Sequence, residues 1–165
     1  MSHLKRMSLT VKNYSLKASG DLDALYSQVR CEDGEGKTFR FNEVVMLAYL
    51  KRHGAIVTDV PVTWYYKHLN RKSIVLVAFE KANGKVVYDL DDMQQVAKSS
   101  VVKGVVFALA AIPAGFIIGT ATYGLGLLFI PAGFFYAYRS LFKIPGMLRR
   151  KTLVSDLAIH GVVVQ

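Results

Sequence analysis

A chain of 165 residues with one cysteine and a net charge of +9 has room for one small domain and a short additional segment. The lone Cys31 excludes an intrachain disulfide and a cysteine-based zinc site, and it favours a reducing compartment. The first residues include Lys5, Arg6, Lys12 and Lys17, so they do not have the apolar core of an export signal. We therefore expect the N-terminal domain to lie in the cytosol.

The chain from Met7 to about Asp92 has the alternation of a mainly β domain. Residues 8–16 predict a strand whose register slips near Tyr14, as at a β-bulge. Residues 25–29 and 38–41 flank the turn sequence CEDGEGK and predict the clearest hairpin.

A short helix is expected next, with Asn42 as its N-cap, EVVMLAYLKRHG as its body and Gly54 as its end. Strands then follow in VPVTWYYKHL, SIVLVAFEKANG and KVVYDLDD, where Asn83 and Gly84 form the turn between the last two. The order predicts a five- or six-stranded sheet with one helix, comparable in pattern to an OB-type barrel. The final apolar residues, 157–164, are compatible with a docking tail or with a strand added to the sheet edge.

The 35 residues from Gly104 to Tyr138 contain no charge, and the pentapeptide IPAGF occurs in them twice. One membrane crossing needs about 20 apolar residues, so this segment is too long for one helix and barely enough for two. Gly, Thr and Tyr residues gather in 119–126, where a turn would lie. We expect a helical hairpin over 98–140 that either spans the bilayer or enters one leaflet as a re-entrant wedge.

Three features of this hairpin have structural consequences. A proline in each half is expected to kink its helix near the middle. Small residues four apart form a strip on each helix, which favours packing within the chain over a homo-oligomer interface. Polar residues occur only near the turn, which argues against a pore. The hairpin residues singled out are Pro113, Gly115, Gly119, Gly124, Pro131 and Gly133.

Basic residues flank the apolar segment on both sides. A positive flank marks the cytoplasmic side of a span, so both termini are expected in the cytoplasm. The apolar, basic stretch after the hairpin is expected to contact anionic headgroups. The residues assigned to this surface are Lys98, Lys103, Arg139, Lys143, Arg149, Arg150 and Lys151.

Candidate chemistry in the soluble part is sparse. Asp89, Asp91 and Asp92 resemble a divalent-cation cluster, but strand termination and helix capping explain them better. Cys31 could pair with His53 or His68 as thiol and base, but its acidic neighbours are expected to raise its pKa. No catalytic residue, metal or cofactor is therefore assigned.

One soluble segment mixes aromatic and cationic residues, as surfaces that stack on bases and neutralise phosphates do. A place in the core or a contact with the membrane ranks above nucleic acid for this segment, because alternate aromatics on a strand are ordinarily half-buried. Its residues are Trp64, Tyr65, Tyr66, Lys67, Arg71 and Lys72.

The sequence thus predicts an α+β membrane protein with a cytoplasmic mainly-β domain over 1–97, a hydrophobic helical hairpin over 98–140, and a basic juxtamembrane tail over 141–165. We expect a non-enzymatic binding, scaffold or assembly module with a protein partner. The alternative is a toxin-like effector whose hairpin permeabilises or remodels a bilayer.

Overall fold

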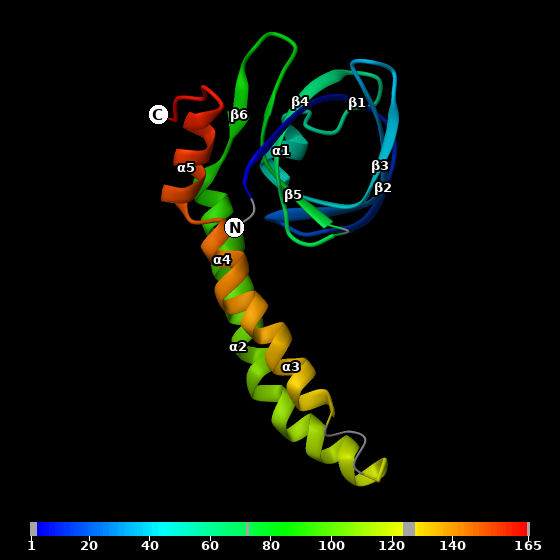
Figure 1. The fold of residues 1–165 in the computed structure, drawn as a ribbon, viewed down its shortest axis with the longest axis vertical. Coiled ribbons are helices and arrows are strands. Elements are labelled where there is room, and N and C mark those ends of the chain that lie inside the picture. Colours follow the sequence, from blue (N-terminus) through cyan, green and yellow to red (C-terminus); the bar gives the residue numbers. More distant parts are fainter. Residues whose placement is uncertain (1–2, 72, 124–127, 165) are drawn as a thin grey trace. The chain divides into compact units, whose positions relative to one another are not determined.

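The computed structural model describes residues 3–71, 73–123 and 128–164 of the chain (Figure 1). It separates into two compact units. The first, the barrel unit, joins Met1–Met93 with Arg150–Gln165, and the second, the helical unit, is Gln94–Arg149. The residues predicted as the end of a juxtamembrane tail thus belong to the same unit as the β domain.

Six strands form one sheet in the barrel unit. They are β1 (Lys5–Ser19), β2 (Asp23–Asp33), β3 (Thr38–Leu47), β4 (Pro61–His68), β5 (Ser73–Glu80) and β6 (Val86–Tyr88). The sheet order is β3-β2-β1-β4-β5-β6, and a parallel β3–β5 pairing closes the first five strands into a barrel. The strand number and the position of the short helix resemble those of OB-type barrels. The expected bulge in β1 is confirmed by register shifts between Val11 and Ala18 against β2.

Alternation along the strands places a dense apolar core inside the barrel. Trp64 is fully buried, and the ring of Phe41 stacks on it with a centroid distance of 6.1 Å. The Tyr66 ring meets Phe41 edge-on at 5.5 Å. Rings in such arrangements bury much apolar area and restrict one another's orientation. The core is therefore closed by aromatic side chains of β3 and β4.

The predicted helix after Asn42 is wrong over most of its length. Asn42 lies within β3, and the helix α1 is only Ala48–Arg52, with no side-chain cap. Residues 43–46 pair with β2 on one side and with β5 on the other, and Val44 and Met46 are buried. The apolar run VVMLAYL fits both helical and strand periods over so short a length, and the two ladders decide for the strand.

The two predicted turns are present. Asp33 closes the β2–β3 turn by accepting hydrogen bonds from the amides of Glu35 and Lys37 through its side chain, at 3.0 and 2.9 Å. Between β5 and β6, Gly84 has a φ of 78°, a left-handed conformation that glycine adopts without steric cost. Its amide donates to the carbonyl of Lys81 at 2.9 Å.

The second half of the chain is helical. It consists of α2 (Leu90–Ala121), α3 (Phe129–Tyr138), the π-helical turn η2 (Arg139–Lys143), α4 (Ile144–Met147) and α5 (Arg150–Ile159). The strand expected over 157–164 is wrong, since α5 extends to Ile159; the alternative of a docking tail agrees with the burial of Leu157 and Val162 in the barrel unit. Part of the expected turn, including Gly124, lies outside the described residues.

Within the helical unit, α2 and α3 run antiparallel and side by side (Figure 1). A Cβ atom on Gly133 would clash with the Cβ of Ala111, and one on Gly104 would lie 3.0 Å from the Cβ of Ser140. The small-residue strip thus packs within the chain. Pro113 lies inside α2, as expected, whereas Pro131 is in the first turn of α3. The kink expected at Pro131 is absent because first-turn amides need no intrahelical acceptor.

Candidate functional site

The aromatic and cationic segment of β4 is core rather than surface. Trp64, Tyr65, Tyr66 and Lys67 are all at most 6% exposed. The indole Nε1 of Trp64 donates to the carbonyl of Ala55 at 2.8 Å. These side chains therefore do not form an exposed surface for stacking. Their burial supports the prediction that the segment belongs to the core. Arg71 is exposed, and Lys72 lies outside the described residues.

Lys67 is buried because α5 covers it. Its Nζ lies 2.6 Å from the Oδ2 of Asp156, with side-chain exposures of 1% and 17%. A second contact of α5 with the barrel is made by His160, whose Nε2 lies 3.2 Å from the carbonyl of Leu4 and whose ring meets that of Tyr65. A buried ion pair of this kind ties two segments that are far apart in the chain.

The remaining sequence candidates have structural roles. Burial raises the pKa of the Cys31 thiol to about 12, so burial rather than the acidic neighbours is the cause, and the thiol is held protonated. The Asp89 side chain accepts hydrogen bonds from the amides of Asp91 and Asp92 at 3.0 and 2.8 Å, which confirms the expected cap. Within the described ranges, no group of three or more His, Cys, Asp and Glu residues could hold a metal ion.

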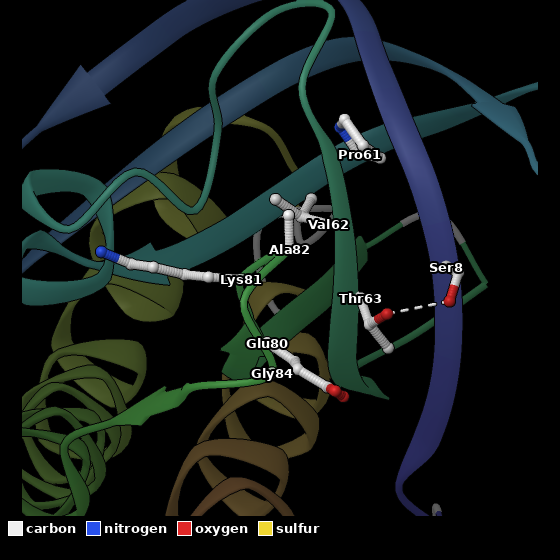
Figure 2. Close-up of a pocket in the computed structure, with 8 residues that line it drawn as sticks. All are labelled: Ser8, Pro61, Val62, Thr63, Glu80, Lys81, Ala82 and Gly84. Carbon is white, nitrogen blue, oxygen red and sulfur yellow. Dashed lines mark hydrogen bonds between the residues drawn. The ribbon is translucent and has the colours of Figure 1, made fainter.

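Three cavities of the barrel unit lie around the β5–β6 turn, a site that sequence reasoning missed. On one side of the turn, a cavity of about 390 Å³ is lined by Ser8, Pro61, Thr63 and Glu80 among others (Figure 2). The Lys81 side chain extends away from Glu80 and Thr63 in this view. The signal available in the sequence was only the pair of lysines that flank Asn83–Gly84.

Two further cavities lie on the α1 side of the turn. One of about 330 Å³ is lined by Tyr49, His53, Lys81, Lys85 and residues 86–88. The other, of about 400 Å³, is lined by apolar Val57, Val60, Val62 and Phe79 together with His53 and Lys81. The two cavities adjoin, since His53 and Lys81 line both, and together we call them the barrel-end cleft. The volume of each is in the range of ordinary ligand sites.

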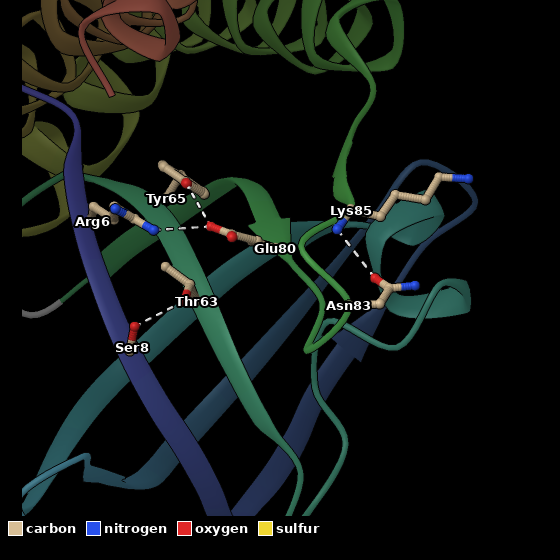
Figure 3. A network of polar contacts seen from close by, with 7 residues as sticks. All are labelled: Arg6, Ser8, Thr63, Tyr65, Glu80, Asn83 and Lys85. Atoms are coloured by element: carbon tan, nitrogen blue, oxygen red, sulfur yellow. Dashed lines mark hydrogen bonds and ion pairs between the residues drawn. The ribbon is translucent and has the colours of Figure 1, made fainter. Parts of the chain in front are cut away.

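The electrostatics differ on the two sides of the turn (Figure 3). Glu80 is neutralised by Arg6 at 3.1 Å and accepts a hydrogen bond from the Tyr65 hydroxyl at 2.9 Å. Burial, together with this bond to Glu80, raises the pKa of Tyr65. In the part of the chain that the structure describes, Lys81 and Lys85 have no ion-pair partner. The barrel-end cleft therefore has cationic side chains at its rim and apolar side chains at its floor.

Among the described residues, most of the exposed large apolar side chains belong to the helical unit. Among the described residues, one helix, Leu90–Thr120, is long and apolar enough to cross a membrane, and only 17% of its most apolar stretch is buried. Leu109, Ile117 and Phe135 are each at least 70% exposed. Apolar patches of this extent on a soluble monomer are rare and mark an interface with protein or lipid.

The basic residues predicted to flank the apolar segment lie at its ends. Lys98 and Lys103 are exposed on α2, and Lys143 is exposed at the end of η2. Arg149 is exposed, and Arg150 forms an ion pair with Asp91 at 3.1 Å within the barrel unit. Lys151 is exposed in α5.

Comparisons of this chain with family models, with curated proteins and with solved structures find no match. The fold and the chemistry of the described residues are therefore the basis for assigning a function.

Proposed function

We propose that the protein is a non-enzymatic integral membrane protein whose helical unit is a membrane hairpin. The hairpin holds the barrel unit at the cytoplasmic face, where the barrel serves as a binding, scaffold or assembly module. The observation that carries this proposal is the connectivity. A pair of helices with an exposed apolar surface and no charge from Gly104 to Tyr138 is inserted between two stretches of chain that together form the barrel unit.

The connectivity supports an even number of crossings. Residues on either side of the helical unit meet inside the barrel unit, as Lys67 with Asp156 and Asp91 with Arg150. A folded barrel does not cross a bilayer, so the chain must enter and leave the membrane on the same side. A two-span hairpin and a re-entrant wedge both satisfy this condition, whereas a single span does not.

The length of the charge-free part of α2 favours a hairpin that reaches across most of the bilayer. From Gly104 to Ala121, at 1.5 Å per residue, α2 extends about 26 Å. The hydrocarbon core is about 30 Å thick. The return limb is opposite, with Gly133 against Ala111 and Ser140 against Gly104, so Lys103 and Lys143 lie near the same end of the pair.

The positive flanks support the orientation. Lysine and arginine beside a span favour the cytoplasmic side, and each contributes about 1 kcal/mol of attraction to anionic headgroups. Aromatic residues Phe134, Phe135 and Tyr138 are exposed just before this basic region. Aromatic side chains followed by cations are the usual anchors at a membrane boundary.

Two features support a binding role over catalysis. The only cysteine is buried with a raised pKa, which makes it a poor nucleophile. The barrel-end cleft combines cationic and apolar side chains, which suits recognition of a ligand. A protein partner is accordingly proposed.

The test is cysteine accessibility in intact cells or sealed vesicles, in a Cys31→Ser background, with single cysteines at His3, Tyr123 or Val163 and an impermeant thiol reagent added outside. Tyr123 is fully exposed and lies at the end of the helical unit opposite the basic flanks. We expect labelling at position 123 only. Labelling at none of the three would replace the two-span hairpin by a re-entrant wedge. Labelling at 3 or 163, or release of the protein from membranes by alkaline carbonate, would overturn the proposal.

The alternative of a membrane-active effector is tested separately. A passive anchor leaves liposomes sealed, so purified protein added to dye-loaded vesicles should release no more dye than a matched detergent blank. Dose-dependent leakage that disappears when Gly133 is replaced by Val would favour permeabilisation, since that change disrupts the helix pair and leaves the barrel unchanged.

A further inference from the structure

The barrel-end cleft has three properties that together indicate one kind of ligand. The first is its rim. Lys81 and Lys85 lack an ion-pair partner among the described residues, and His53 lies beside Lys81. The acidic groups of the neighbouring elements are engaged elsewhere, Glu80 by Arg6 and Asp59 by Lys12 at 3.1 Å. The rim therefore presents unneutralised positive charge to an incoming acidic group.

The second property is the floor. Val57 and Val60 are 43% and 41% exposed, although both adjoin the buried side chains of Val62 and Phe79. Covering these exposed valines with an apolar partner would stabilise the complex by about 25 cal/mol per Å² of apolar area removed from water. The cleft therefore accepts apolar side chains next to acidic ones.

The third property is the open edge of the sheet. The β6 strand is the end strand of the sheet order. The amide of Lys81 donates to the carbonyl of Lys85 at 3.0 Å, so this pair is hydrogen-bonded and the next pair, Glu80 with Val86, is not. The amide and carbonyl of Val86 consequently point away from β5, and Val86 lines the cleft. A strand edge at a groove is the usual place for an extended peptide to add.

We propose that the barrel-end cleft binds an acidic, partly apolar segment of a partner protein in extended conformation, with its carboxylates at Lys81 and Lys85, its apolar side chains over Val57 and Val60, and its backbone along Val86. This inference rests on the proposed role of the barrel as a binding module and names its site and the chemistry of its partner. A peptide fits better than a nucleic acid because the aromatic rings of the β4 segment are buried and the Tyr49 ring already contacts that of His53, with centroids 4.1 Å apart.

The test uses the full-length protein in detergent micelles and fluorescence anisotropy of a short labelled peptide in which Glu alternates with Val. Two comparison peptides carry Lys in place of Glu, or N-methylated valines, whose amides cannot donate strand hydrogen bonds. We expect the Glu-Val peptide to bind and both comparison peptides to bind at least roughly tenfold more weakly. Absence of binding by the Glu-Val peptide, or equal binding of the Lys peptide, would overturn the inference.

Matched charge variants locate the site. The double change Lys81→Glu with Lys85→Glu should weaken peptide binding roughly tenfold or more, as removal of close charge pairs does. The control is Lys37→Glu with Arg40→Glu, which makes the same change of charge at exposed positions of the β2–β3 hairpin. Equal loss in both doubles would mean nonspecific attraction and would refute the site. Because all four side chains are solvent-accessible, both double variants should keep the wild-type circular dichroism spectrum. The double change Val57→Ser with Val60→Ser is an independent test that leaves the charge unchanged, and it should also weaken peptide binding.

Competitors separate the possible sources of negative charge. Inorganic phosphate, single-stranded DNA and phosphatidylserine vesicles are added in turn to the peptide complex. We expect none of them to displace the peptide as effectively as unlabelled peptide does. Displacement by DNA or vesicles at lower concentration, lost in the Lys81/Lys85 double variant, would reassign the cleft to that ligand. Loss of peptide binding with unchanged labelling at position 123 would overturn only this inference, whereas a protein released from membranes would overturn the proposed function.

Discussion

The barrel unit and the helical unit are both rich in large apolar side chains, but they place them oppositely. In the barrel unit, Trp64 and Leu76 are 0% exposed, whereas in the helical unit Phe116 and Ile117 are 59% and 70% exposed. In the barrel, small side chains lie among larger ones, while in the helix pair Ala111 and Gly133 occupy the interface and the large residues face outwards. This difference is the one expected if, as proposed, the barrel unit lies in water and the helical unit in lipid.

A helix pair with small residues at its interface is stabilised mainly by the close packing of its two backbones. Between helices in lipid there is no hydrophobic driving force, and van der Waals contact between small residues replaces it. A barrel in water is stabilised by removing large apolar side chains from solvent. Core substitutions should therefore destabilise the barrel, and only changes at small residues should destabilise the helix pair.

The largest contrast is expected between two aromatic truncations. Trp64→Ala removes a fully buried indole and its hydrogen bond to Ala55, and should lower the free energy of unfolding of the barrel by about 3–5 kcal/mol. Phe116→Ala, at a 59% exposed position, should change it by less than about 0.5 kcal/mol. Urea titration of the detergent-solubilised protein, followed by β-sheet circular dichroism, measures both. Equal effects would mean that the helix surface is buried in the folded protein.

The contact between α5 and the barrel is tested by Lys67→Met. This change leaves Asp156 mostly buried without its cation, and should destabilise the barrel unit by about 3–5 kcal/mol. The double variant Lys67→Met with Asp156→Leu should recover most of the loss, because an apolar pair replaces the ion pair. Limited proteolysis within α5 provides the second readout. If Lys67→Met left both stability and cleavage unchanged, α5 would not be part of the barrel unit.

The helix interface is tested by Gly133→Val. A Cβ there would overlap the Cβ of Ala111, so the helices must separate, at about 1–3 kcal/mol. The matched control is Gly146→Val, since a Cβ at Gly146 meets nothing within 4 Å. Disulfide cross-linking between cysteines at Phe107 and Tyr136, whose rings are in contact, reports the separation in a Cys31→Ser background. Cross-linking that is unaffected by Gly133→Val would contradict the packing.

The start of α2 is tested by Asp89→Ala, which removes the acceptor for the amides of Asp91 and Asp92 and should cost about 1 kcal/mol. The variant Asp89→Asn keeps an oxygen in the same place and should lose only a few tenths of a kcal/mol. Thermal unfolding of the two variants under the same conditions gives the difference. A larger loss for Asn than for Ala would rule out capping as the role of this side chain.

The smallest effect concerns alkaline pH. Burial raises the pKa of Cys31 from an ordinary 9.0 to about 12, so the unfolded chain loses this proton first as the pH rises. The contribution of Cys31 is complete below about 9 and is lost progressively as the pH rises towards about 12. The difference in unfolding free energy between wild type and Cys31→Ala should therefore shrink above about pH 9. A difference that stayed constant would place the thiol in contact with water.

Several features were predicted correctly because short-range physics decides them. The β2–β3 turn and the Asn83–Gly84 turn depend on side chains within a few residues, and so does the Asp89 cap. The long uncharged run from Gly104 to Tyr138 was sufficient to predict apolar helices. The barrel was predicted as a class from strand number, although its closure through β3 and β5 was not.

Other features could be decided only by contacts between distant segments. Residues 43–47 are apolar enough for helix or strand, and pairing with both β2 and β5 selects the strand. The aromatic and cationic β4 segment has the composition of a surface, but α5 and the barrel core cover it. The barrel-end cleft joins α1, the β4 approach and the β5–β6 turn, which no local pattern relates.

The sequence by itself thus determined where the chain turns, where its helix α2 is capped, and which stretch forms uncharged, apolar helices. It could do so because these properties depend on neighbouring residues or on composition. Only the tertiary structure decided that Lys67 is buried, that the last helix belongs to the barrel unit, and that small residues rather than large ones meet between α2 and α3. Burial is a property of what packs against a residue, and the partner in each of these contacts lies more than twenty residues away along the chain.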